Sequence, residues 1–199
     1  PAYLPERVPH KAIFWRSGRA GNKAWEQDLL DLMHFRGLAI LTFNCEALIT
    51  KHGWAYVEWL LKKRRAMVVA DESSWASNYS KRTQKLLALG RRPNAVVRAI
   101  LDGTPVDEGP TDILYPTNFL RRGLLGYGSM LAFKNRYVAY AEEEIAPGVR
   151  VRKKGYNHNT QTEYDIQVGF QNLEELTTNL DRFSVRVRRA DVSDAPEKL

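Results

Sequence analysis

Short apolar runs alternate with amphipathic segments along the first hundred residues. The apolar runs predict strands at 11–16, 38–43, 66–70 and 95–101, and the segments between them predict helices at 23–34, 54–63 and 81–89. The run 66–70 (AMVVA) is apolar at every position, which is typical of a parallel strand covered on both faces. We therefore expect a three-layer α/β domain in which parallel strands are joined by helices.

The pattern changes near residue 109. Segment 111–120 has a helical period but contains Pro116, which predicts a kink or a break. Segments 149–153 and 163–168 are predicted to pair as one hairpin with 157–162 at its tip. Further expected elements are an acidic turn at 142–148, a short helix at 173–180, a strand at 183–188, and an amphipathic helix over 129–140 whose apolar positions include Leu131, Tyr137 and Val138.

Composition narrows the class of protein. The 199 residues include 30 Lys or Arg against 23 Asp or Glu, a net charge of +7. One cysteine, Cys45, excludes a disulfide framework and a multi-cysteine zinc site. No apolar run reaches the roughly 20 residues of a membrane helix, so we expect a cytoplasmic protein with no membrane partner. The first residue is not Met and both ends are abrupt, so we expect a piece of a longer polypeptide.

The basic excess lies in clusters interspersed with aromatic residues. This arrangement fits a polyanionic partner, and it equally fits the solvated surface of an ordinary globular protein. The clusters are 62–65, 91–92, 121–122, 150–154 and 186–189.

Two of the predicted strands end in segments that suit nucleotide chemistry. Asp71 and Glu72 follow the run 66–70, and a Gly103-Thr104-Pro105 turn follows the run 95–101. One helix and one strand lie between them, so we expect both turns at the same carboxyl edge of a parallel sheet, where α/β proteins bind ligands. Paired carboxylates hold a magnesium ion and orient water in nucleotide hydrolysis, although a strand followed by a polar turn is also a common structural feature.

Taken together, these segments resemble the first RecA-like lobe of superfamily-two helicases, specifically the Swi/Snf-type DNA-dependent ATPases and their phage relatives. Residues 71–74 (DESS) stand where the family has its DExx motif, and 101–105 (LDGTP) resemble its L-T-G-T-P motif. Segment 41–46 (LTFNCE) is similar to a family segment that contacts the nucleic-acid backbone. Segments 183–192 and 195–198 resemble the segment that leads toward a second lobe. The resemblance implies a partial lobe over 1–120, a helical and hairpin insertion over 121–182, and a return strand and linker over 183–199.

The resemblance also assigns roles. It implies that Asp71 holds Mg²⁺ through water, that Glu72 activates the attacking water, and that the Gly103-Thr104 turn, with Asp102, couples ATP hydrolysis to lobe closure. DNA, or RNA, would be bound through its phosphates. We expect Thr42 and Asn44 to contact that backbone together with Lys81 and Arg82, for which an exposed helix start is an equally good interpretation.

The sequence departs from the family pattern in three places. Asp102 replaces the usual Thr, and Ser73-Ser74 replaces the usual Ala-His. No G-x-x-x-x-G-K-[ST] loop is present, so the triphosphate has no backbone amide cradle and no lysine in this chain. We therefore expect the chain alone to be inactive, with its phosphate loop and second lobe elsewhere in the polypeptide. Two alternatives stay open: a basic nucleic-acid-binding module without ATPase activity, and an unrelated α/β enzyme that uses Asp71 and Glu72 on a metal.

Overall fold

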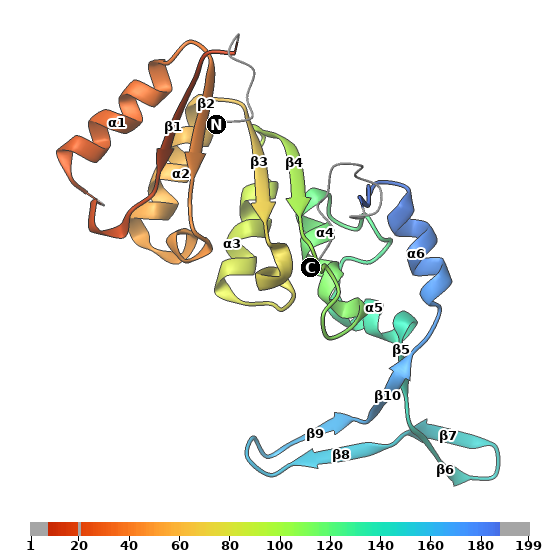
Figure 1. Cartoon of the computed structure of the whole chain (residues 1–199). Coiled ribbons are helices and arrows are strands. Elements are labelled where there is room, and N and C mark those ends of the chain that lie inside the picture. Colours follow the sequence, from red (N-terminus) through yellow and green to blue (C-terminus); the bar gives the residue numbers. More distant parts are fainter. Residues whose placement is uncertain (1–7, 20, 188–199) are drawn as a thin grey trace, which may run out of the picture.

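The computed structural model describes residues 8–19 and 21–187. It is a mixed helix and strand protein in which the strands of the first half form two parallel pairs, as expected for the α/β class. Strand β1 (His10–Phe14) pairs with β2 (Leu38–Thr42), and β3 (Ala66–Asp71) pairs with β4 (Ala95–Leu101). All four arrows point the same way in Figure 1. In the described part of the chain, however, β2 does not pair with β3, so the single continuous sheet that we expected is divided into two.

Each helix of this half starts at a capping side chain. The helices are α1 (Lys23–His34), α2 (Lys51–Lys63) and α3 (Lys81–Gly90). Helix α2 starts three residues before the predicted position because Thr50 Oγ1 accepts a hydrogen bond from the Gly53 N–H at 3.0 Å. Short 3-10 helices precede α1, α2 and α3 at Ser17–Arg19 (η1), Cys45–Ile49 (η2) and Ser73–Ala76 (η3).

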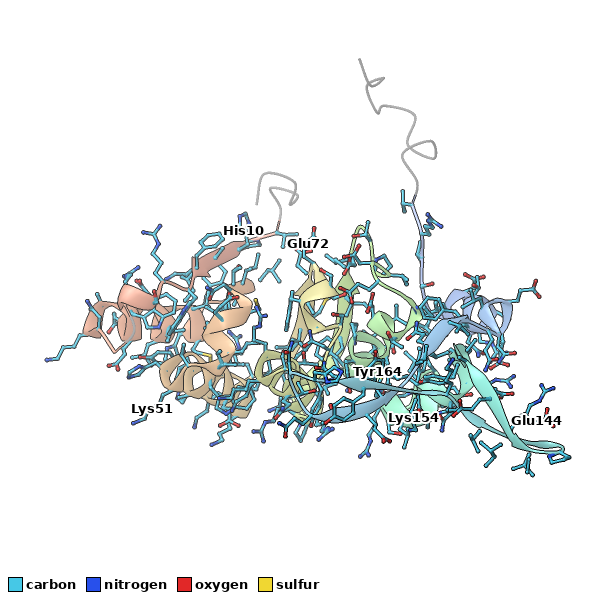
Figure 2. The ribbon with its side chains drawn as sticks, turned by 90° about the horizontal axis from the view of Figure 1, so that it is seen from below. His10, Lys51, Glu72, Glu144, Lys154 and Tyr164 are labelled. Carbon is cyan, nitrogen blue, oxygen red and sulfur yellow. The ribbon has the colours of Figure 1, made fainter. Side chains whose placement is uncertain are left out.

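In the part of the chain that the structure describes, helices cover one face of the β3–β4 pair and leave the other exposed. Val68, Ala70 and Ile100 pack against Leu86 of α3 and Phe119, and together they form a hydrophobic cluster. Met67, Val69, Val97 and Leu101 lie on the opposite face and are exposed, Met67 by 59%. Figure 2 shows α2 and α3 on one side of the strands, with the other side open. The expectation that 66–70 is covered on both faces is therefore wrong for the described residues, although apolar residues occupy both faces.

The second half has a hydrophobic core of its own. Its helices are η4 (Pro110–Ile113), α4 (Leu114–Leu120), α5 (Met130–Tyr137) and α6 (Leu173–Asp181). The helical segment is broken between η4 and α4, two residues before Pro116. Pro116 itself lies in the first turn of α4, where a proline is tolerated. The core consists of Ile113, Leu114, Leu125, Phe133, Tyr137 and Leu176.

Strands β5–β10 form a stem and two hairpins instead of the one hairpin that we expected. The stem is β5 (Val138–Tyr140) with β10 (Gln167–Phe170). The hairpins are β6 (Glu142–Ala146) with β7 (Val149–Arg152), and β8 (Lys154–Asn157) with β9 (Thr162–Asp165), and they project from the molecule in Figure 1.

The hydrophobic pattern misses β6 because the first three residues of this strand are all glutamate. Glu142 and Glu144 of the supposed acidic turn stand opposite Arg152 and Arg150 in β7, so opposite charges face each other across the ladder. The predicted tip, 157–162, is the tip of β8–β9.

The remaining expectations for the second half have mixed outcomes. The helix expected over 129–140 ends at Tyr137, and the short helix at 173–180 is confirmed as α6. Of the strand expected at 183–188, residues 183–187 have no regular structure, and 188–199 lie outside the described residues. Among the residues that the structure describes, no helix is long and apolar enough to cross a membrane.

Candidate functional site

The DESS segment and the LDGTP segment lie side by side. Asp71, the last residue of β3, is paired with Leu101, the last residue of β4. Just beyond, the Ser73 hydroxyl donates a hydrogen bond to Asp102 Oδ2 at 2.9 Å. The two turns therefore share one carboxyl edge of a parallel strand pair, which confirms the arrangement that the sequence predicted.

Asp71 and Glu72 present their side chains to solvent at this edge. Asp71 Oδ1 accepts a hydrogen bond from the Glu72 N–H at 3.1 Å, and the Asp71 carbonyl accepts one from Trp75 Nε1 at 3.1 Å. Glu72 adopts a left-handed backbone conformation (φ 48°, ψ 56°), which costs energy for a residue other than glycine. Within residues 8–19 and 21–187, the Glu72 carboxylate has no hydrogen-bond or ion-pair partner, and Figure 2 shows it on the open side of the strands.

Asp102 joins the two turns. Its Oδ2 accepts from the Ser73 hydroxyl, and its Oδ1 accepts from the Thr104 N–H at 2.9 Å. Ser73 is buried, with 2% of its surface exposed, so its hydroxyl depends on this partner. Two of the three residues that depart from the family pattern, Ser73 and Asp102, are thus bonded to each other. Gly103 between these contacts has open space at the position of a Cβ, so packing does not require a glycine there.

The four residues expected to contact nucleic acid lie at and just after the carboxyl end of β2 and at the start of α3. Thr42 is the exposed last residue of β2, and Asn44 Oδ1 caps η2 by accepting from the Ala47 N–H at 3.3 Å. Lys81 is the exposed first residue of α3, whereas the Arg82 guanidinium forms an ion pair with Glu46 at 2.9 Å. That pair brings the segment after β2 against the start of α3, and it partly neutralises the charge of Arg82.

Cys45 and Glu46 influence each other's protonation. Burial, and then the neighbouring Glu46, raise the pKa of the Cys45 thiol. The hydrogen bond from that thiol, with the Arg82 contact, lowers the pKa of Glu46. The thiol therefore stays protonated at neutral pH, which agrees with a packing role and not with a nucleophile.

The residues present suit a magnesium ion held together with substrate phosphates. In the part of the chain that the structure describes, no three His, Cys, Asp or Glu side chains come close enough to hold a metal by themselves. Mg²⁺ commonly binds through one or two carboxylates, several waters and the phosphates of its substrate. The exposed Asp71 carboxylate, whose Oδ2 makes no hydrogen bond in the described structure, fits that mode.

Sequence reasoning missed a pocket beside these turns. Its volume is about 380 Å³, and Ser74 and Pro105 border it together with Tyr79, Tyr115 and Lys134. The Tyr79 and Tyr115 rings lie 5.5 Å apart. The sequence pattern does not indicate that two tyrosines from separate segments come together. The turn that borders the pocket is fixed by Asp112, whose Oδ2 accepts hydrogen bonds from the N–H groups of Asp107, Glu108 and Gly109, and the hydrophobic pattern does not indicate these bonds either.

No family model, curated protein or solved structure matches this chain. The resemblance to the Swi/Snf-type lobe therefore depends on the motifs and on their arrangement.

The link between Ser73 and Asp102 can be measured by a double-mutant cycle. Ser73→Ala is expected to lower the free energy of unfolding by about 1–2 kcal/mol, because Asp102 loses a buried hydroxyl donor. In an Asp102→Ala background the same change should cost about 1 kcal/mol less. Urea unfolding of the four proteins gives the coupling energy. Ser74→Ala, at the exposed neighbour, is the matched control, and strictly additive losses would contradict the link.

Proposed function

We propose that this chain is part of the first RecA-like lobe of a Swi/Snf-type motor that couples ATP hydrolysis to movement along nucleic acid. The observation that carries the proposal is the shared edge, where Asp71 is paired with Leu101 and Ser73 bonds to Asp102. Two carboxylates and a Gly-Thr turn at the carboxyl ends of parallel strands are the groups that such a site needs.

In this proposal each carboxylate has a separate task. Asp71 holds Mg²⁺ through water, and the ion neutralises charge that develops on the phosphates. Glu72 orients and deprotonates the attacking water, for which its exposed carboxylate, without a partner among the described residues, is suited. The Glu72 backbone conformation supports a functional reading, because strained residues are common at active sites.

Asp102 would transmit changes at one turn to the other. It accepts hydrogen bonds from Ser73 in the DESS segment and from Thr104 in the LDGTP segment. A shift of either turn during hydrolysis must therefore move or break a contact of the other. The proposal places the phosphate-binding loop and the second lobe in other parts of the polypeptide, and the exposed apolar face of β3–β4 is a surface that a further layer would cover.

The test is ATP hydrolysis by the intact polypeptide with and without nucleic acid. We expect duplex DNA, or RNA, to stimulate hydrolysis, and we expect the 199-residue chain alone to give no turnover. The isolated chain, purified in the same way, serves as the control for contaminating ATPases. Absence of hydrolysis in the intact polypeptide would contradict the proposal, as would hydrolysis that nucleic acid leaves unchanged.

The second candidate is a nucleic-acid-binding module without ATPase activity. It is favoured by the engagement of Asp102 with Ser73 and Thr104, which leaves that carboxylate fewer lone pairs for a metal, and by the absence of a phosphate loop from the sequence. The same experiment separates the two candidates, because a passive module binds nucleic acid and never hydrolyses ATP.

A further inference from the structure

The two ends of strands β2, β3 and β4 carry opposite charge, whereas the segment that follows β1 (15–22) contains two cations, Arg16 and Arg19. The three segments that follow β2, β3 and β4, with their last strand residues (42–50, 71–80 and 101–113), contain seven Asp or Glu and no Lys or Arg. The three segments that precede these strands (35–37, 62–65 and 91–94) contain seven Lys or Arg and no Asp or Glu. Because the four strands point the same way, the acidic segments and the basic segments lie at opposite ends (Figure 1). We call the basic end the amino-end rim; its cations are Arg36, Lys62, Lys63, Arg64, Arg65, Arg91 and Arg92.

Hydrogen bonds hold the three basic segments together. Arg64 Nη1 donates to the Met33 carbonyl at 3.0 Å, which joins the end of α2 to the end of α1. Asn94 Nδ2 donates to the Leu61 carbonyl at 2.7 Å, and the Ala66 N–H donates to the Asn94 carbonyl at 2.8 Å. These hydrogen bonds place segment 62–65 next to the end of α1 and next to segment 91–94.

Most of the rim charge is available to a ligand. Arg64 is engaged with main-chain carbonyls, and Arg92 forms an ion pair with Glu58. The other five rim cations are exposed, and no carboxylate within residues 8–19 and 21–187 pairs with any of them. By contrast, Arg82 at the acidic end is already paired with Glu46.

The rim cations lie at the C-terminal ends of three helices, and together they carry more charge than one helix end requires. Lys62 and Lys63 lie in the last turn of α2, where cations interact favourably with the helix C-terminus. Arg91 is the C-cap residue of α3, and Arg65 and Arg36 directly follow the C-caps of α2 and α1, so the rim gathers the cations of three helix C-termini at one end of the strands. Like charges gathered on one surface repel one another, and an extended anion relieves that repulsion.

We propose that the amino-end rim binds the phosphate backbone of a nucleic acid. Its cations come from three segments at the amino ends of β2, β3 and β4, and a row of phosphates offers a charge to each of these segments, whereas a single small anion does not. The surface lies at the opposite end of the strands from Asp71 and Glu72, and binding there requires no ATP hydrolysis. It adds a contact surface to those expected at Thr42, Asn44, Lys81 and Arg82.

The test measures DNA binding by the 199-residue chain, with fluorescence anisotropy of a labelled 20-base-pair duplex over a series of salt concentrations. The rim variant combines Lys62→Gln, Lys63→Gln, Arg65→Gln and Arg91→Gln. The control variant combines Arg121→Gln, Arg122→Gln, Arg150→Gln and Lys153→Gln, which removes the same charge from exposed positions away from the rim.

The rim variant should bind the duplex at least about tenfold more weakly than the parent chain. The slope of the logarithm of its binding constant against the logarithm of salt concentration should be smaller in magnitude by up to about 4. The control variant should retain most of the parent affinity. Equal losses of DNA affinity in the two variants would overturn the proposal. Absence of DNA binding by the parent chain at a low salt concentration of about 50 mM would also overturn it.

A second measurement needs no variant and so does not depend on how the rim variant folds. Acetylation of Lys62 and Lys63, read by mass spectrometry, should slow when the duplex is added, while Lys153 should react as before. Unchanged acetylation of Lys62 and Lys63 at saturating DNA would overturn the proposal. Protection of the same lysines by anionic lipid vesicles or by polyglutamate, without protection by DNA, would overturn the choice of nucleic acid.

Discussion

An intact enzyme that carries Glu72→Gln is expected to bind ATP as the parent enzyme does and to hydrolyse it at least about 100-fold more slowly. The substitution keeps the length of the side chain and removes its negative charge and its ability to take a proton. The Glu72 carboxylate has no partner in the described structure, so its loss breaks no hydrogen bond or ion pair. Hydrolysis and nucleotide affinity, measured separately, distinguish a chemical role from a binding role.

Glu108→Gln is the matched control for this prediction. Glu108 is also exposed and lies in the segment after β4, where its N–H, and not its carboxylate, bonds to Asp112. Its substitution should leave the rate unchanged. Hydrolysis by the Glu72→Gln enzyme at the parent rate would show that the role assigned to Glu72 is wrong, even if nucleic acid still stimulates the enzyme.

Phe133→Ala should have the largest effect on stability, a loss of about 3–5 kcal/mol in the free energy of unfolding. The Phe133 side chain is fully buried, and its ring lies 4.6 Å from that of Tyr137 and 5.7 Å from that of Tyr127. Truncation therefore leaves a cavity in the core of the second half. Chemical denaturation followed by circular dichroism measures the loss.

Leu131→Ala controls for the effect of substitution in the same helix. Leu131 lies two residues away in α5 and is 70% exposed, so its truncation should change the free energy of unfolding by less than about 0.5 kcal/mol. If the two variants were equally stable, the second core would not be packed as described.

Leu131 also illustrates a limit of sequence reasoning. The sequence places it among the apolar positions of the 129–140 helix, and Tyr137 and Val138 from that same prediction are indeed buried. Helix α5 ends at Tyr137, however, and Val138 begins β5. A periodic pattern finds an apolar position but does not say which neighbouring element will cover it, because that depends on contacts with distant segments.

The strands and the neighbouring turns of the first half were the most predictable features. Parallel strands joined by a helix bring their carboxyl ends to one edge, so the adjacency of Asp71 and Leu101 follows from chain order. The direction of the Asp102 carboxylate was not predictable, because it depends on the buried hydroxyl of Ser73. The pairing of β6 with β7 was missed because β6 begins with three glutamates and so lacks the apolar alternation that indicates a strand.

The division of the strands into two pairs affects how the chain behaves at high concentration. In the described structure each of β1, β2, β3 and β4 has only one ladder partner, so every one of them is an edge strand. Such edges offer unpaired N–H and C=O groups to other molecules, and β3 and β4 add an exposed apolar face beside them. Self-association through intermolecular strand pairing is therefore the main hazard in preparing this chain by itself.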